Sequence, residues 1–186
     1  MKIRLVTAAV AVAIALAVPT SAQESREGSY TKIPTVKGIE TLKAGAKAPV
    51  FTVRDLADGE FDLSAAGKDT VLLFFWSFFC GPCREEIPMI NQMVRDYRGK
   101  GLQVVGVNLD GREMKKAIEK FVASEKVDFR IVFDELTGDS FKVADPYGVA
   151  GTPAIFLIDR KGVISFSAVG AVTPERLKAE IEKVIR

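Results

Sequence analysis

The chain has 186 residues, no histidine and only two cysteines. Without histidine it cannot build a His-liganded zinc or haem site, a Ser-His-Asp triad or a Cys-His protease site. It also lacks an excess of one charge: 26 basic residues stand against 24 acidic ones, and the numbers become equal when Lys2 and Arg4 are set aside with a removable segment. Equal numbers of basic and acidic residues leave no excess positive charge to attract nucleic acid or an anionic membrane, so we expect neither as a partner.

The longest apolar run lies at the N-terminus and is short. It extends from Leu5 to Val18 after two basic residues, and small residues follow it up to Ala22. This order is typical of a secretory signal peptide, which we assign to residues 1–22 with cleavage near Ala22. The alternative is an uncleaved anchor, but 14 residues fall short of the roughly 20 that span a bilayer. We therefore expect the mature protein in the periplasm or elsewhere outside the cytoplasm.

The rest of the chain is long enough for one well-buried domain and short for two. Residues 23–44 are polar and show no clear hydrophobic period, so they are interpreted as a flexible linker. The folded domain is expected to cover residues 45–186.

The chain is organised around the stretch Val71–Cys83. Its first six residues are apolar and rich in aromatic side chains, which is typical of a strand buried on both faces. The sequence Cys80-Gly81-Pro82-Cys83 then opens a helical pattern. A helix N-terminus favours a thiolate at Cys80, and Cys83 lies one turn further on, close enough to attack a mixed disulfide formed at Cys80. The position and spacing of the two cysteines predict a redox site.

Hydrophobic periodicity predicts an alternating order of strands and helices. Strands are expected at 50–53, 60–63, 71–76, 101–108, 130–133, 154–158 and 163–168, and helices from Cys83 to Gly99, at 111–124 and from Pro174 onward. Residues 134–147 are expected to form a loop with one helical turn. Alternating β-α-β units give parallel strands and a late tight turn adds an antiparallel hairpin, so we expect a mixed, three-layer α/β domain.

The stretch Phe75–Cys83 resembles the active-site strand and loop of the thioredoxin superfamily. Three further motifs resemble the TlpA/ResA-like family of extracytoplasmic thiol–disulfide oxidoreductases: Gly45–Phe51, Cys83–Pro88 and Tyr147–Pro153. Four motifs in this order are far more specific than a lone Cys-x-x-Cys. The resemblance implies a thioredoxin-like α/β/α fold with a mixed central sheet and an N-terminal β-hairpin extension. It also implies an oxidoreductase that needs no cofactor beyond its redox-active disulfide, Cys80–Cys83.

Two other interpretations of the cysteines remain open: a structural disulfide, and half of a metal site. Two intervening residues close a very small loop, so the bridge would constrain the unfolded chain little. The chain has no further cysteine and no histidine to complete a metal site. Redox chemistry is the favoured interpretation, and no metal is expected.

The resemblance also assigns substrate-binding residues. It implies that the Thr152–Pro153 peptide bond is cis and lies beside the disulfide, which leaves the backbone of Thr152 free to pair with a substrate. The alternative is a proline that only starts a strand. Gly81 and Pro82 lie between the cysteines, and Phe79, directly before Cys80, is expected at the surface as an apolar substrate contact.

Glu86 is a candidate proton carrier for Cys83. Thioredoxins have a buried Asp six residues before the first cysteine, and Phe74 stands at that position here. ResA-like reductases resemble this chain in having a glutamate at the position of Glu86, where it is implicated in thiol protonation. The alternative is a solvated surface carboxylate, which we expect of Glu85.

These observations predict a reductase of protein disulfides, with Cys80 as nucleophile and Cys83 as resolving thiol. The resemblance implies apocytochrome c thiols as substrate, a membrane thiol donor of the CcdA/DsbD type, and roles in cytochrome c biogenesis and cell redox homeostasis. We expect a monomer. Two alternatives are a peroxiredoxin-like thiol peroxidase, although no proline or threonine precedes Cys80 in its loop, and a Cu(I) delivery module, although no Met-x-x-x-Met pattern lies near the thiols.

Overall fold

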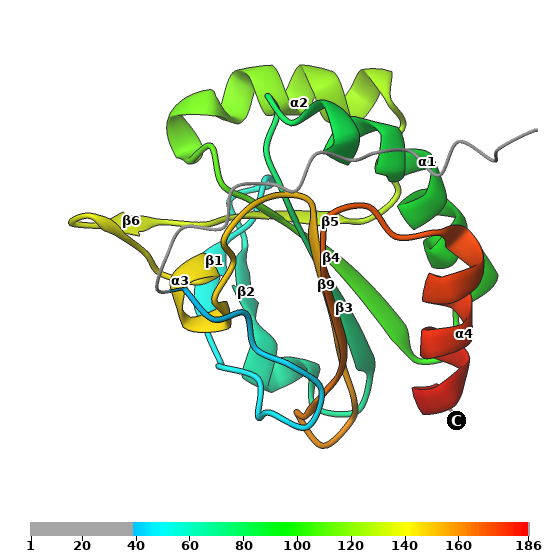
Figure 1. Cartoon of the computed structure of the whole chain (residues 1–186). Coiled ribbons are helices and arrows are strands. Elements are labelled where there is room, and N and C mark those ends of the chain that lie inside the picture. Colours follow the sequence, from blue (N-terminus) through cyan, green and yellow to red (C-terminus); the bar gives the residue numbers. More distant parts are fainter. Residues whose placement is uncertain (1–38, 186) are drawn as a thin grey trace, which may run out of the picture. The chain divides into compact units, whose positions relative to one another are not determined.

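A five-stranded sheet with strand order β5-β4-β3-β8-β9 forms the centre of the domain (Figure 1). The computed structural model describes residues 39–185, so the predicted signal peptide and most of the predicted linker lie outside the described residues. The strands are β3 (Thr70–Trp76), β4 (Leu102–Asn108), β5 (Arg130–Phe133), β8 (Ala154–Ile158) and β9 (Ile164–Val169). Strands β3, β4 and β5 are parallel, whereas β8 and β9 run antiparallel to their neighbours. The predicted mixed sheet is confirmed.

Strand β3 is buried along its whole length, as its apolar sequence predicts. Successive side chains of a strand point to opposite faces of the sheet, so β3 contributes to two separate cores. Leu72, Phe74 and Trp76 belong to one core, and Val71, Leu73 and Phe75 belong to the other. Both faces of the sheet must therefore be covered.

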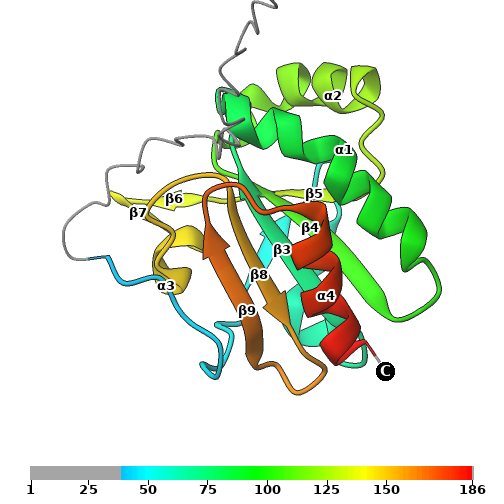
Figure 2. The ribbon, with the colours of Figure 1, turned by 45° about the vertical axis from the view of Figure 1, so that its right-hand side comes forward.

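Three helices cover the first face: α1 (Gly81–Asp96), α2 (Lys115–Ser124) and α4 (Pro174–Val184). The second face packs against the short helix α3 (Ala144–Tyr147) and the antiparallel hairpin of β1 (Thr52–Arg54) and β2 (Glu60–Asp62), which continues into η1 (Leu63–Ala66). Figure 2 shows α1, α2 and α4 from the side on which they lie. The predicted three layers and the N-terminal hairpin are thus present.

Several element ends differ from the sequence predictions. Helix α1 ends at Asp96, before Gly99, and the turn η2 (Arg112–Met114) precedes α2. The predicted loop at 134–147 contains its helical turn, α3, but it also contains a small hairpin of β6 (Leu136–Thr137) and β7 (Ser140–Phe141). Two-residue strands are too short to show a hydrophobic period, and the only sign of this hairpin in the sequence is Gly138-Asp139, a pair typical of a two-residue hairpin turn.

The topology gathers several chain segments at one edge of the sheet. The parallel strands β3, β4 and β5 all end at this edge, and the antiparallel strand β8 begins there. The segments after β3 and β4, the segment before β8 and the segment after β9 therefore meet. Cys80, Asp110, Pro153 and Val172 lie on these four segments.

Contacts of the folded domain begin a few residues before the predicted boundary at Gly45. The hydroxyl of Thr41 donates to the carbonyl of Gly148 at 2.7 Å, and the N–H of Leu42 donates to the carbonyl of Tyr147 at 3.0 Å. Within residues 39–185, none of the helices has the length and apolar character needed to span a membrane.

Candidate active site

Cys80 and Cys83 form a disulfide with an S–S distance of 2.00 Å at the start of α1. Cys80 is the N-cap of the helix, and its sulfur accepts the N–H of Cys83 at 3.2 Å. Cys80 is half-buried, whereas Cys83 has 0% of its surface exposed. Cys80 is therefore the more accessible of the two cysteines to a molecule arriving from solvent.

The electrostatics of the helix end favour negative charge at Cys80. Helix α1 has 16 residues, and its first turn contains no acidic side chain that would offset the partial positive charge of the helix N-terminus. This environment stabilises a thiolate at the N-cap, which is the form of cysteine that attacks a disulfide. Gly81 and Pro82 are both exposed between the two cysteines, so this side of the site is open.

The Thr152–Pro153 peptide bond is cis, as the resemblance implies. The carbonyl of Pro153 accepts the N–H of Gly170 at 2.8 Å, which ties it to the end of β9. Ala154 pairs with Phe75 in the β3–β8 ladder, so Pro153 lies level with the end of β3, next to the segment that leads to Cys80. Neither the N–H nor the C=O of Thr152 has a hydrogen bond within the described residues.

Glu86 is buried, with 7% of its surface exposed, although its neighbour Glu85 is exposed. Its Oε1 accepts the N–H of Val172 at 2.7 Å, and its Oε2 has no hydrogen-bond partner in the described part of the chain. Burial raises the pKa of Glu86 to about 7, and the Val172 hydrogen bond offsets only part of this increase. A carboxyl group that titrates near neutral pH therefore lies on α1, one turn beyond Cys83.

Glu86→Gln is expected to stabilise the oxidised protein at high pH. The pKa of Glu86 in the folded state lies above the usual glutamate value of 4.5, so folding favours the protonated acid. The contribution of protonated Glu86 to the free energy of unfolding is fully present below pH 4.5. It is lost as the pH rises from 4.5 through 7. Above pH 8, a pKa shift of this size lowers the free energy of unfolding of the wild-type protein by about 3 kcal/mol. Urea unfolding should show the variant to be more stable than wild type at pH 9 and similar at pH 5.

Glu85→Gln is the matched control for this prediction, because it makes the same change on the same helix at an exposed position. Its effect on the free energy of unfolding should be small at both pH values. Equal pH dependence in wild type and Glu86→Gln would contradict a raised pKa.

Aromatic side chains surround the approach to Cys80. Phe79 is 74% exposed, and its ring lies 5.3 Å from that of Phe78. Phe78 packs edge-on against Phe121 at 5.5 Å, and Trp76 stacks on the same ring at 5.7 Å. The row of rings runs from the core to the surface and ends in an exposed apolar side chain beside the active cysteine.

Three polar residues next to the site were not predicted from the sequence: Ser77, Asn108 and Asp110. The carboxylate of Asp110 accepts hydrogen bonds from the hydroxyl of Ser77 and from the backbone N–H of Phe78, both at 2.6 Å. The signal in the sequence was the pair Asn108 and Asp110 at the end of a buried strand, since the ends of parallel strands meet at one edge of a sheet.

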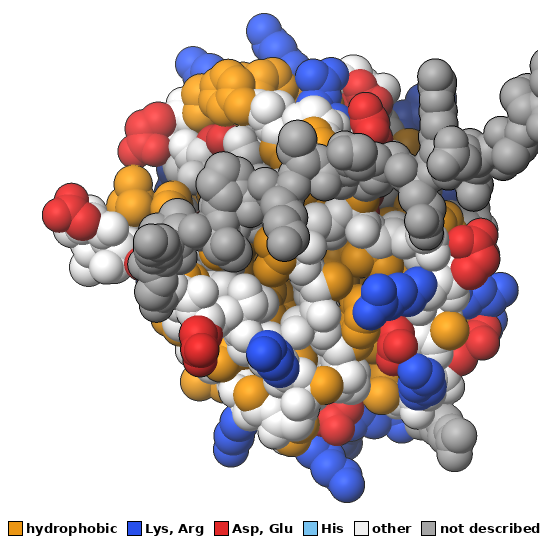
Figure 3. Space-filling view, viewed as in Figure 1, with side chains coloured by type: hydrophobic (Ala, Val, Ile, Leu, Met, Phe, Trp, Pro, Cys, Tyr) orange, Lys and Arg blue, Asp and Glu red, His pale blue; other side chains and the backbone are white. Residues whose placement is uncertain are grey.

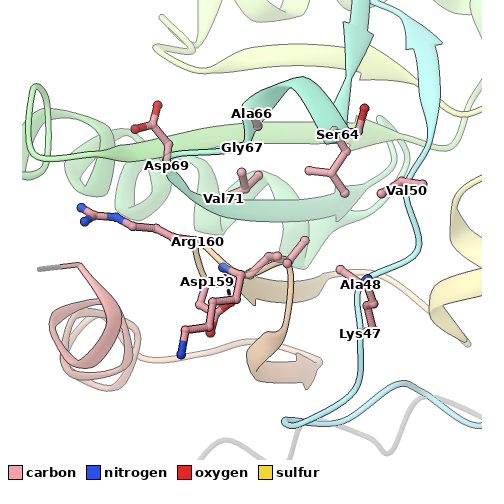
Figure 4. Close-up of a pocket in the computed structure, with 14 residues that line it drawn as sticks. Lys47, Ala48, Val50, Ser64, Ala66, Gly67, Asp69, Val71, Asp159 and Arg160 are labelled. Carbon is pink, nitrogen blue, oxygen red and sulfur yellow. Dashed lines mark hydrogen bonds between the residues drawn. The ribbon is translucent and has the colours of Figure 1, made fainter.

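A hollow of about 260 Å³ lies at the opposite end of the sheet and includes neither cysteine (Figure 4). It is lined by Ala48, Val71 and Ile158, with Lys47 and Arg160 among its charged residues. Val71 is the second residue of β3, whose far end leads to Cys80, so the hollow is separate from the candidate active site.

Charged side chains of both signs are interspersed on the face shown in Figure 3. The described residues contain no group of three or more Cys, Asp or Glu side chains placed to hold a metal ion.

Comparisons with known proteins agree with this geometry. The model of the AhpC/TSA family matches residues 44–167. The thiol-disulfide oxidoreductase ResA of Bacillus subtilis is 31% identical over 136 residues, which cover 73% of this chain and 73% of the relative. ResA of Geobacillus thermodenitrificans is 33% identical over 143 residues, covering 77% of this chain and 79% of the relative.

Solved structures show the same fold. A crystal structure from Chlorobium tepidum, described as a candidate thiol:disulfide interchange protein DsbE, superimposes with a TM-score of 0.69 at 36% identity and covers 79% of this chain and 100% of that chain. The thioredoxin domain of a thiol-disulfide oxidoreductase from Bacteroides vulgatus gives a TM-score of 0.67 at 28% identity, covering 78% of this chain and 100% of that chain.

Proposed function

The chain belongs to the AhpC/TSA family and is a thiol–disulfide oxidoreductase of the ResA/DsbE type, and on this premise we propose that it reduces protein disulfides through Cys80 and Cys83. The observation that carries the proposal is the unequal exposure of the two bonded cysteines. Cys80 caps the helix at the surface, and Cys83 is fully buried behind it. One sulfur is placed to meet a substrate and the other to displace it.

The proposed reaction begins with both cysteines reduced. The thiolate of Cys80 attacks one sulfur of the substrate disulfide, so a Cys80–substrate bond forms, the substrate S–S bond breaks and the other substrate sulfur leaves as a thiolate. The thiol of Cys83 then loses its proton and attacks the sulfur of Cys80. This closes the Cys80–Cys83 disulfide and expels the second substrate thiolate. Two electrons pass from the protein to the substrate, which is released as a dithiol.

Glu86 is proposed as the group that takes the proton from Cys83. The two residues lie one turn apart on α1, and both are buried. A general base works best when its pKa is close to the ambient pH, and the pKa of Glu86 is raised to about 7. The oxygen Oε2 has no other partner within residues 39–185, so it is free to accept a proton.

The substrate is proposed to bind as an extended segment across the site. The unpaired backbone groups of Thr152 would form hydrogen bonds to it, beside the cis bond to Pro153. Exposed Phe79 supplies apolar contact, while Gly81 and Pro82 leave space around Cys80. This arrangement recognises main-chain atoms and therefore suits unfolded proteins that carry a disulfide.

The partners and location are proposed on the resemblance of the sequence to the TlpA/ResA-like family. The substrates would be disulfide-bearing secreted proteins, with apocytochrome c as the leading example. Because an extracytoplasmic compartment is oxidising, the Cys80–Cys83 disulfide must be reduced again by two electrons from a dithiol. A membrane thiol carrier of the CcdA/DsbD type would supply them. The protein is proposed to act as a monomer after removal of the signal peptide.

The equilibrium reduction potential tests the direction of the reaction. The reduction potential of the Cys80–Cys83 pair, measured by equilibration with defined thiol buffers, should lie closer to that of thioredoxin (about −270 mV) than to that of DsbA (about −120 mV). The protein should also reduce insulin in the presence of dithiothreitol. A potential near that of DsbA would overturn the reductase assignment, and rapid peroxide consumption without insulin reduction would favour the peroxidase alternative.

A further inference from the structure

The residues Ser77–Cys80 form a tight turn that delivers Cys80 to the start of α1. The N–H of Cys80 donates to the carbonyl of Ser77 at 3.1 Å, and the N–H of Phe79 donates to the hydroxyl oxygen of Ser77 at 3.1 Å. Phe79 is exposed, so in this turn only Phe78 is held by aromatic packing, against Phe121. The position of the Cys80 sulfur therefore depends in part on the hydrogen bonds of the turn, above all when the disulfide to Cys83 is open.

The carboxylate of Asp110, which lies outside the turn, accepts two hydrogen bonds from it. Oδ1 of Asp110 accepts the hydroxyl of Ser77 at 2.6 Å, and Oδ2 accepts the N–H of Phe78 at 2.6 Å. Asp110 thus binds a side chain and a backbone group of the turn at the same time, from a position 33 residues away from Ser77 in the sequence.

Asp110 is itself held in place by a buried neighbour. Asn108 has 0% of its surface exposed and lies opposite Trp76 in the β3–β4 register. Its side-chain amide donates to Oδ2 of Asp110 at 2.8 Å, and its side-chain oxygen accepts the N–H of Asp110 at 3.1 Å. Its carbonyl accepts the N–H of Asp134 at 2.9 Å, which links it to the end of β5. The ends of β4 and β5 therefore set the position of the carboxylate.

We propose that Asp110 is a positioning residue for disulfide exchange: by holding the Ser77–Cys80 turn, it holds the Cys80 sulfur at the helix N-terminus in the orientation needed for attack. This inference rests on the proposed function, because the affected step is the attack of Cys80 on a disulfide. A negative charge on this side of the turn disfavours a thiolate at Cys80. The contribution of Asp110 is therefore geometric, and its charge is not the useful property.

Two substitutions at Asp110 separate geometry from charge. Asp110→Ala removes the hydrogen bonds to the turn together with the charge. Asp110→Asn removes the charge but keeps an oxygen for the N–H of Phe78 and an amide that can donate to Ser77. The rate constant for exchange with a small neutral disulfide should fall about 10-fold to 100-fold in the alanine variant. The asparagine variant should stay within about threefold of wild type. The thiol pKa of Cys80, taken from the pH dependence of alkylation, should be higher in the alanine variant than in the asparagine variant.

Asp62→Ala is the matched control. Asp62 also accepts one backbone N–H and one hydroxyl, both from Ser64, at 2.8 and 2.7 Å, but it lies before the start of β3, away from the cysteines. The Asp62→Ala substitution should lower thermal stability without changing the rate of disulfide exchange. If Asp110→Ala does not fold, Ser77→Ala serves instead, because it removes the hydroxyl that joins Asp110 to the turn; it should slow exchange by a smaller factor.

The outcomes of this experiment are distinct. A wild-type rate in the folded alanine variant would overturn the inference, and so would equal impairment of the alanine and asparagine variants, since equal impairment would show that the charge matters. Failure of the wild-type protein itself to exchange disulfides would instead overturn the proposed function.

Discussion

Cys83→Ser is expected to stall the protein as a covalent adduct with its substrate, and Cys80→Ser is expected to abolish disulfide exchange. The physical reason is the difference in access: Cys80 lies at the surface end of α1, whereas Cys83 is fully buried. Without Cys80 no reachable nucleophile remains, so turnover should fall by more than about 10³-fold. Without Cys83 the first attack still proceeds, but no thiol displaces the substrate.

Mass spectrometry of each variant after incubation with a disulfide-bearing peptide provides the measurement. Cys83→Ser should carry the mass of one peptide chain on Cys80, and dithiothreitol should release it. Cys80→Ser is the paired control, because it has one free cysteine at the same helix end and should stay unmodified. An adduct on Cys83 that forms as fast as the one on Cys80 would show that the buried sulfur is accessible and would contradict the assigned order of the two thiols.

The same Cys83→Ser variant would retain physiological substrates from an extract, including apocytochrome c if it is one of them.

The position of the disulfide could be predicted because its determinants are local in sequence. A fully apolar run defines the buried strand, and the Cys-Gly-Pro-Cys sequence follows it after three residues, where a helical pattern begins. The alternation of later strands and helices likewise gave the order of β4, α2, β5, β8, β9 and α4. Patterns of this kind arise from burial of one face or both faces of an element, which the amino-acid types record.

The rest of the site depends on contacts between residues that are far apart in the chain. Glu85 and Glu86 have the same chemistry and adjacent positions, and only the approach of Val172 to α1 makes one of them a buried acid. Asp110 becomes part of the site only because the parallel pairing of β3 with β4 brings it to the turn before Cys80. Sequence spacing contains no record of such pairings, so these residues could be suspected at most as polar residues at a strand end.

Gly148→Ala is expected to lower the stability of the domain by about 3 kcal/mol. Gly148 has φ of 65° at the end of α3, a conformation that costs an alanine roughly 1 kcal/mol. A Cβ atom there would also clash with the carbonyl oxygen of Glu40, a backbone atom that can move only with its chain segment. That movement would break the hydrogen bonds of Thr41 to Gly148 and of Leu42 to Tyr147, each contributing about 1 kcal/mol. Thermal unfolding should therefore show a Tm lower by about 6–12 °C.

Gly162→Ala separates the two causes of this loss. Gly162 has a similar φ of 75°, but a Cβ there would meet no atom within 4 Å, so only the conformational cost of about 1 kcal/mol applies. The difference between the two variants measures the contact of Gly148 with Glu40 and the hydrogen bonds that depend on it. Equal losses would mean that residues 40–42 do not pack against the turn at Gly148. A clearly larger loss for Gly148→Ala would make these residues part of the folded domain and a support for residues 148–153, the segment that leads to the cis peptide bond beside the active site.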